Sequence, residues 1–251
     1  MQRYFVEIDE SNKIIFSKDD IFHISKVMRM KINDQIEIVN NSKLYLAKII
    51  SFNPTLDAEI IEEIDRKTEL NTYIRLLYCI PKGEKLDLVI QKACELGVDE
   101  IVLVNSSRCV AKIDSKNKDK KIERFSKIIK EASEQSKRLK FMKLSDVIDY
   151  KDITKYKADL SLIAYEKEDP KVTSVKKILE ENEYKVINVL VGAEGGFSEE
   201  EVDFAIKNSY KSISLGRRIL RSETACFYLL SILSYYAEIN YEKCIWSFKK
   251  I

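Results

Sequence analysis

Histidine is nearly absent from this chain of 251 residues, which contains only His23. A Ser-His-Asp triad or a multi-histidine metal centre would have to be built around that single side chain. Five cysteines are scattered through the sequence without a C-x-x-C pair, so we predict reduced thiols, no disulfide and no metal site. Chemistry elsewhere in the chain must therefore use carboxylates, arginine, lysine, tyrosine, serine or the backbone.

Long apolar runs are also absent. The most apolar stretch, 227–236, is interrupted by Ser231 and Ser234 and is shorter than the roughly 20 residues that span a bilayer. Met1–Glu10 carries acidic residues and no long apolar segment, so we expect no signal peptide, no membrane partner and a cytoplasmic location. With 43 basic and 41 acidic side chains the net charge is only +2, so overall charge indicates no partner and its distribution has to be considered instead.

The periodicity of apolar residues changes near residue 70 and predicts two domains. The first part contains short apolar or alternating segments that predict strands, and one helix that Ser17, Asp19 or Asp20 can cap. After a polar linker at 65–71, apolar segments alternate with helical ones, which predicts a parallel sheet with helices on both faces. We therefore expect an α/β fold with a small β-rich domain at 1–67 and a larger domain at 72–251.

A glycine loop, G-A-E-G-G at 192–196, directly follows a predicted strand. Ser198 and Glu201 fit a capping box, so we expect a helix to begin there. A strand, a glycine loop and a helix start usually cradle phosphate, but neither phosphate-binding glycine motif matches. Glu194 and the glutamates at 199–201 would also repel a polyphosphate. The loop therefore indicates either a ligand that is neutral or cationic at its reactive end, or only a tight turn between buried elements.

A second loop, S-L-G-R-R-I-L-R-S-E-T-A at 214–225, also joins a predicted strand to a helix, which Ser222 can cap. Leu215 and the pair 219–220 are apolar residues beside a strand end, which favours a pocket wall for a flat group. The three arginines of the loop favour an anionic partner or transition state. A solvated arginine cluster with a hydrophobic staple would have the same sequence.

These two loops together resemble those of one family, the SPOUT-class ribosomal RNA (uracil-N3)-methyltransferases of the small subunit, where they read close to G-P-E-G-G and L-G-x-x-I-L-R-x-E-T-A. Further blocks resemble that family in the same order along nearly the whole chain. They are H-I-S-K-V-M-R-M from His23, K-G-E-K-L-D-L-V-I-Q-K-A-C-E-L-G-V at 82–98, S-S-R-C-V at 106–110 and E-A-S-E-Q-S-K-R at 131–138. The sequence departs from the pattern in four places: Ala193 and Arg218 replace prolines, Ser107 replaces a glutamate, and 139–143 lacks the proline expected after E-Q-S-x-R.

The resemblance implies a PUA-like β-barrel RNA-binding domain at 1–67 and a SPOUT domain with a deep trefoil knot at 72–251. It also implies a homodimer that methylates N3 of uracil-1498, in the usual numbering, of 16S ribosomal RNA in the small ribosomal subunit. The methyl donor would be S-adenosylmethionine, and no metal is needed. A nearby carboxylate is compatible with its sulfonium, and glycines allow close backbone approach to its adenine and ribose.

The resemblance further suggests site residues. Donor-binding residues are expected at Leu162, Gly192, Glu194, Gly195, Gly196, Leu215, Gly216, Ile219, Leu220 and Thr224, and the strand end 162–166 is expected to supply a third donor loop. For catalysis we expect Arg221 to stabilise the imide anion, with Glu194 and Glu223 as candidate proton acceptors, although Glu223 at a helix start also has a structural explanation. RNA-contacting residues are expected at Arg3, His23, Arg29, Arg108, Gln135 and Arg138. The basic stretch 112–143 is either a phosphate-tracking surface or a solvated helix face.

Two other functions remain open from the sequence. One is a SPOUT enzyme that methylates a different RNA atom, such as a ribose 2′-hydroxyl or a guanine. The other is a non-catalytic RNA-binding module whose glycine loop is only structural. A nucleotide-dependent enzyme is disfavoured by the acidic glycine loop.

Overall fold

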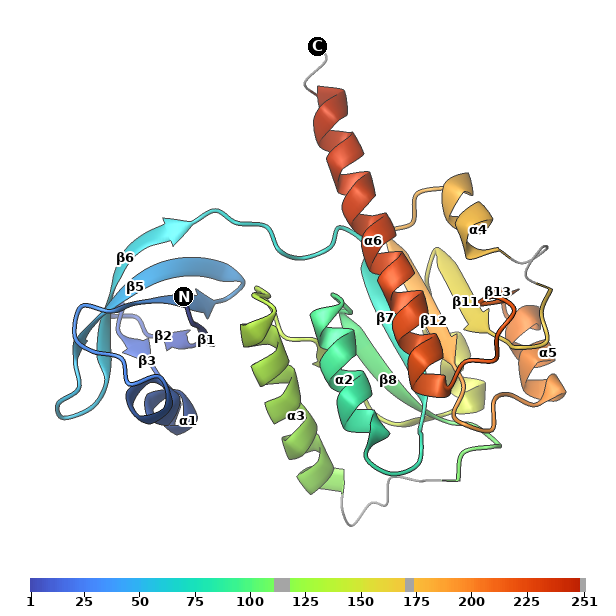
Figure 1. Cartoon of the computed structure of the whole chain (residues 1–251), viewed down its shortest axis with the longest axis horizontal. Helices are drawn as coiled ribbons and strands as arrows, with labels where there is room; N and C mark the ends of the chain where they lie inside the picture. Colours follow the sequence, from blue (N-terminus) through green and yellow to red (C-terminus); the bar gives the residue numbers. More distant parts are fainter. Residues whose placement is uncertain (111–117, 170–173, 249–251) are drawn as a thin grey trace. The chain divides into compact units, whose positions relative to one another are not determined.

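The chain divides into two compact units in the computed structural model, which describes residues 1–110, 118–169 and 174–248 (Figure 1). Unit 1 contains Met1–Glu69 and Lys130–Phe141, and unit 2 contains Leu70–Ile129 and Met142–Ile251. Part of the basic stretch predicted at 112–143, residues 112–117, lies outside the described residues. Unit 1 thus includes the segment Lys130–Phe141, which lies far along the chain from the predicted β-rich domain at 1–67.

Unit 1 is built on a four-stranded sheet with the order β1-β4-β5-β6. Its strands are β1 (Arg3–Phe5), β4 (Gln35–Asn40), β5 (Lys43–Ser51) and β6 (Asp57–Ile64). β1 is parallel to β4, whereas the other two pairings are antiparallel. Two further short strands, β2 (Glu7–Ile8) and β3 (Ile14–Ile15), form a separate antiparallel pair. Alternate apolar residues of these strands form a buried core, which includes Tyr4, Ile14, Ile36, Ile38, Ala47 and Ile49.

The predicted helix of unit 1 is present as α1 (Lys18–Phe22) and continues into a π-helix, His23–Val27. Ser17 and Asp20 form a capping box, in which each side chain accepts a hydrogen bond from the backbone N–H of the other. This reciprocal contact satisfies two donors at the helix start that have no partner within the helix. The predicted cap is therefore confirmed.

Buried charges hold residues 130–141 in unit 1. Lys130 pairs with the buried carboxylate of Asp20. Arg3 is only 1% exposed and donates hydrogen bonds to the backbone carbonyls of Lys137 and Arg138. The side chain of Arg138 is also buried and lies 2.7 Å from the carboxylate of Glu69. Removing one partner of such a buried pair leaves an uncompensated charge, so these contacts specify where the segment lies.

Unit 2 contains a seven-stranded sheet in which every pairing is parallel. The strand order is β10-β8-β7-β12-β11-β13, and β9 also pairs with β8. The strands are β7 (Tyr73–Cys79), β8 (Glu100–Asn105), β9 (Lys143–Leu144), β10 (Ile148–Asp149), β11 (Leu160–Ala164), β12 (Val186–Val191) and β13 (Tyr210–Ile213). The central strands β7 and β12 are apolar and buried along most of their length, as expected for a parallel sheet covered on both faces. The predicted parallel sheet is therefore confirmed.

Helices connect these strands. They are α2 (Lys85–Glu95), α3 (Lys118–Gln135), a 3-10 helix (Tyr150–Lys155), α4 (Val175–Glu181), α5 (Glu199–Lys207) and α6 (Ser222–Phe248). α2 packs beside α6 in front of the sheet, and α5 packs against β13 (Figure 1). Gly97 has φ +84 just beyond α2 and ends that helix. Within the described ranges, no helix combines the length and apolar character that crossing a membrane requires.

A polar network stabilises the sheet around Glu100, whose side chain is 3% exposed. Its carboxylate accepts hydrogen bonds from Arg75 Nε at 2.6 Å and Tyr73 Oη at 3.1 Å, and it lies 3.0 Å from Lys143 Nζ. Burial acts to raise the pKa of Glu100, but hydrogen bonds from Ser145, Arg75 and Lys143 outweigh it and lower the pKa to about 2. The ionised carboxylate is therefore stabilised in the folded state.

Glu100→Gln should lower the free energy of unfolding by about 2 kcal/mol at pH 7, because Arg75 and Lys143 then lose their anionic partner. The pKa of Glu100 is depressed by folding, so its contribution is present above the ordinary value of 4.5 and is lost as pH falls towards about 2. Urea unfolding of wild type and variant at pH 7 and near pH 2 measures this difference, which should be large at neutral pH and small in acid.

Glu63→Gln is the matched control, because Glu63 pairs with Lys43 at the surface and both side chains are more than half exposed. It should change the free energy of unfolding by less than about 1 kcal/mol at either pH. An equal effect of the two substitutions at pH 7 would show that the Glu100 network does not stabilise the fold.

Candidate active site

Three loops meet at the carboxyl ends of β11, β12 and β13, which are neighbours in the sheet. They enclose a cavity of about 400 Å³. Its lining residues come from the end of β11, from the glycine loop 192–197 and from the loop 214–222. They are Ala164, Tyr165, Glu166, Val191, Gly192, Ala193, Glu194, Gly195, Gly196, Phe197, Ser214, Leu215, Gly216, Arg218, Ile219, Leu220, Arg221, Ser222 and Ala225. Ligands of open parallel sheets bind at this edge, so the cavity is the candidate site.

The glycine loop folds so tightly that side chains are excluded at two of its positions. A Cβ on Gly192 would lie 3.2 Å from backbone atoms of Gly196 and from the ring of Phe197. Gly196 itself has φ +61, a conformation that residues with a side chain rarely adopt. The backbone of this loop is therefore open to close approach by a ligand.

The helix that follows the glycine loop is fixed by the predicted capping box. Ser198 and Glu201 exchange hydrogen bonds at the start of α5. Glu201 also accepts a hydrogen bond from the backbone N–H of Ser107 at 2.7 Å, and its carbonyl accepts one from Tyr150 Oη at 2.8 Å. Its buried carboxylate thus connects the loop after β8 to α5. The capping box is confirmed, and Glu201 has a structural role.

The second loop is joined to the first by Ser222. The Ser222 hydroxyl donates a hydrogen bond to the carbonyl oxygen of Gly192. The buried hydroxyl of Tyr78 lies 2.8 Å from Ser222 Oγ on the other side and is placed to donate to it. The sequence predicts Ser222 as a helix cap, whereas the structure begins α6 at this residue and uses its hydroxyl to connect the two loops.

Lys85 lies between the two glutamates that the sequence suggests as proton acceptors. Its Nζ is 3.1 Å from Glu194 and 3.3 Å from Glu223. Glu194 also accepts from the backbone N–H of Lys82 at 3.3 Å. Burial acts to raise the pKa of Glu194, but hydrogen bonds from its own backbone N–H and from Lys85 lower it below its ordinary value. A carboxylate held ionised in this way is a weak proton acceptor.

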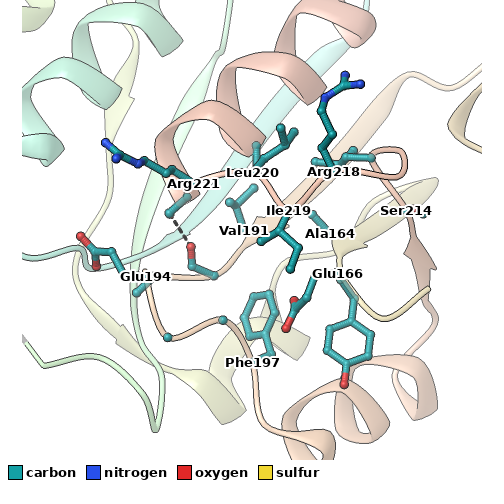
Figure 2. Close-up of a pocket in the computed structure, with 18 of the residues that line it drawn as sticks. Ala164, Glu166, Val191, Glu194, Phe197, Ser214, Arg218, Ile219, Leu220 and Arg221 are labelled. Atoms are coloured by element: carbon teal, nitrogen blue, oxygen red, sulfur yellow. Dashed lines mark hydrogen bonds between the residues drawn. The ribbon is translucent and has the colours of Figure 1, made fainter. Parts of the chain in front are cut away.

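The arginines of the second loop are exposed. Figure 2 shows the side chains of Arg218 and Arg221 extending outward from the loop, whereas Ile219 and Leu220 lie against the cavity. Ile219 is 85% exposed although it lines the cavity. Most of the apolar surface of Ile219 is therefore available to contact a ligand in the cavity.

Most predicted donor-site residues line the cavity. These are Gly192, Glu194, Gly195, Gly196, Leu215, Gly216, Ile219 and Leu220, together with Arg221 from the catalytic set. Three others do not line it: Leu162 is buried within β11, Thr224 is exposed in the first turn of α6, and Glu223 lies beside Lys85. The strand end 162–166, which the resemblance implies as a third donor loop, contributes Ala164, Tyr165 and Glu166 to the lining. The sequence reasoning assigned no role to Phe197, although its position just after a glycine pair was a visible signal.

The predicted RNA-contacting residues of unit 1 lie in different environments. Arg3 is buried and pairs with Glu37 at 2.9 Å, and Arg138 pairs with Glu69, so these guanidinium groups already have internal partners. Nδ1 of His23 lies 2.9 Å from the hydroxyl of Tyr4. Two further side chains of the set are exposed, those of Arg29 and Gln135.

Arg108 in unit 2 lies beside the glycine loop. Its Nη1 donates a hydrogen bond to the carbonyl oxygen of Gly195 at 2.9 Å, and its side chain is otherwise exposed. A Cβ on Gly195 would come within 3.0 Å of Arg108 Cβ. Of the predicted RNA-contacting residues, this one lies against the candidate site.

Comparison with known proteins assigns residues 68–234 to an RNA methyltransferase domain and residues 16–56 to an RNA methyltransferase PUA domain. The chain is 33% identical to ribosomal RNA small subunit methyltransferase E of Bacillus subtilis, over 95% of this chain and 98% of the relative. The protein of that name from Mesomycoplasma hyopneumoniae is also 33% identical, over 92% and 98%.

Two solved structures are similar throughout. The Neisseria gonorrhoeae ribosomal RNA small subunit methyltransferase E bound to S-adenosyl methionine has a TM-score of 0.81 and 26% identity, covering 94% of this chain and 97% of that chain. A methyltransferase from Legionella pneumophila in complex with the same cofactor has a TM-score of 0.82 and 28% identity, covering 93% and 96%.

Lys85→Met should raise the pKa of Glu194, because it removes a hydrogen bond and a positive charge that favour the ionised carboxylate. Titration of the glutamate side-chain carboxyl carbons by NMR, with Glu194 assigned from Glu194→Gln, measures the change. Lys176→Met is the control, since Lys176 pairs with Glu180 on the surface of α4. An unchanged or lower pKa of Glu194 in Lys85→Met would contradict the proposed contact, and a shift in the control would show a non-specific effect.

Proposed function

The chain belongs to the ribosomal RNA small subunit methyltransferase E family, and we propose that it transfers a methyl group from S-adenosylmethionine to N3 of uracil-1498 in 16S ribosomal RNA. The observation that carries this proposal is the cavity at the ends of β11, β12 and β13. The family resemblance and the geometry agree there, because the two sequence loops that match the family form most of its lining.

The cavity fits the donor in shape and chemistry. The glycine loop allows a ligand to approach its backbone closely, since Gly192 and Gly196 carry no side chain. Leu215, Ile219 and Leu220 provide apolar surface for a flat ring such as adenine. S-adenosylmethionine, when bound, supplies a methyl group on a sulfonium that is a good leaving group. No metal is required for such a transfer, and among the described residues no cluster of His, Cys, Asp or Glu could hold one.

Uracil N3 becomes a good nucleophile only after it loses its proton. Arg221 at the rim of the cavity is placed to stabilise the resulting negative charge on the imide, as the donors of an oxyanion hole do. Glu194 and Glu223 both lie beside Lys85. Hydrogen bonds from its own backbone and from Lys85 hold the pKa of Glu194 below its ordinary value, which makes it a poor proton acceptor. We therefore assign the main chemical role to Arg221 and a positioning role to the two glutamates.

The same family membership supports proposals for the whole molecule. Unit 1 would bind RNA as a PUA-like barrel, and the chain beyond residue 72 would contain the trefoil knot. The contact of Ser222 with Gly192 supports the knot, because it brings the start of α6 back to the loop after β12. We further propose a homodimer in the cytoplasm. Tyr228 and Tyr235 support the dimer, since they are large exposed side chains seven residues apart on α6.

The function is tested by incubating the protein with isolated 30S particles, or with naked 16S ribosomal RNA, and labelled donor, followed by mapping of the methyl group. We expect one methyl group on N3 of uracil-1498. Methylation of another base or of a ribose would support a different RNA target. Donor binding by calorimetry without any methyl transfer to either substrate would instead support a non-catalytic RNA-binding module.

Arg221→Ala should lower the single-turnover rate of methyl transfer by about 10²–10³, the usual effect of losing one donor to a developing oxyanion. The dissociation constant for S-adenosylmethionine should change less than about threefold, because the donor contacts are mainly backbone and apolar. Arg217→Ala is the matched control, since Arg217 belongs to the same loop but does not line the cavity. Equal losses of rate and donor affinity in Arg221→Ala would show that the arginine shapes the pocket instead.

A further inference from the structure

Glu166 differs from the other glutamates around the cavity because its carboxylate has no hydrogen-bond or ion-pair partner among the described residues. Glu194 pairs with Lys85, Glu199 pairs with Lys167, and Glu201 caps α5. Within the described part of the chain, the Glu166 carboxylate makes no hydrogen bond or ion pair. A carboxylate that lines a ligand cavity without an internal partner is available to bind a group that donates hydrogen bonds.

The position of Glu166 is fixed by two elements of the site. It follows β11 by two residues, and the neighbouring strand β12 leads into the glycine loop. A Cβ on Gly196 would lie 3.3 Å from Glu166 Oε1, so the carboxylate lies directly against that glycine. Figure 2 shows Glu166 pointing into the cavity next to Phe197, with Glu194 and Arg221 on the other side of the view. Glu166 therefore faces the non-reacting part of a ligand whose reacting atom lies near Arg221.

We propose that Glu166 binds the ribose hydroxyl groups of the methyl donor and thereby selects a ribonucleoside. This inference rests on the proposed function. Two neighbouring hydroxyls can each donate a hydrogen bond to one oxygen of an ionised carboxylate, and such charge-assisted bonds are stronger than neutral ones. Acidic residues bind a ribose in the same way in dinucleotide-binding folds.

The other polar parts of the donor match Glu166 less well. The sulfonium has no hydrogen to donate, and its methyl group must face the uracil on the side of Arg221. The amino-acid end carries a carboxylate beside its amino group, so Glu166 would repel one as it attracted the other. The adenine ring needs flat apolar surface, which Leu215, Ile219 and Leu220 provide. The ribose hydroxyls are therefore the groups of the donor that best match the carboxylate of Glu166.

Calorimetry with three compounds tests the proposal on the full chain. S-adenosylmethionine has every group, S-adenosylhomocysteine lacks the positive sulfur, and methylthioadenosine also lacks the amino acid. Glu166→Gln should weaken all three by the same factor, about tenfold, because all three have the ribose and lose one charge-assisted contact. Glu180→Gln, the same change on the exposed face of α4, should leave all three affinities unchanged.

Other patterns in Glu166→Gln would overturn the proposal. A loss confined to S-adenosylmethionine would assign Glu166 to the sulfonium, and a normal affinity for methylthioadenosine would assign it to the amino-acid end. Unchanged affinity for all three would show that Glu166 does not bind the donor. If the wild-type protein binds none of the three compounds, the proposed function itself is contradicted. Failure of the Glu166 proposal can thus be distinguished from failure of the proposed function.

A direct test replaces the ribose. Wild-type protein should bind methylthioadenosine about tenfold more tightly than its 2′-deoxy analogue, and Glu166→Gln should bind the two compounds nearly equally. Glu166→Asp keeps the charge and should retain part of the preference. Equal binding of both compounds by the wild type would overturn the proposal. Because Glu166 is exposed, its substitution should leave the thermal unfolding midpoint close to that of the wild type, which checks that the variants are folded.

Discussion

The site depends on a short chain of buried hydrogen bonds that joins its two main loops. Tyr78 on β7 contacts Ser222 at the start of α6, and Ser222 donates to the carbonyl of Gly192. All three residues are buried, where an unpaired hydroxyl or carbonyl costs about 1–3 kcal/mol. The two loops are therefore held together before any ligand arrives. The cavity between them follows from this contact and from the absence of side chains on the glycines.

The glutamates around the site have different roles although they are the same residue type. One glutamate connects the loop after β8 to α5, two lie around Lys85, and Glu166 lines the cavity and has no partner among the described residues. The first three thus hold parts of the site together through their partners. Under the proposed ribose contact, Glu166 is the carboxylate that discriminates between ligands. The same residue type thus has three different roles within one site.

The sequence predicted those features that depend on local pattern. The parallel sheet, the helix cap at Ser17 and the capping box at Ser198 are all present, because periodicity and caps are encoded within a few residues. It did not predict that residues 130–141 belong to unit 1, or that Arg3 is buried. Those features depend on pairings between distant residues, and no local pattern distinguishes a buried arginine from an exposed one.

Pairings between distant residues also determine which arginine side chains are available to RNA. Arg3 and Arg138 could contact a phosphate only by giving up their ion pairs with Glu37 and Glu69, and breaking a buried ion pair typically costs about 3–5 kcal/mol. Arg218 and Arg221 have no such cost, since both are exposed. They also belong to the loop whose apolar residues line the cavity, so the contacts that shape the cavity also determine the position of these charges. Under the proposed function, one segment of the chain would therefore provide both the apolar wall for the donor and the charges that face the RNA.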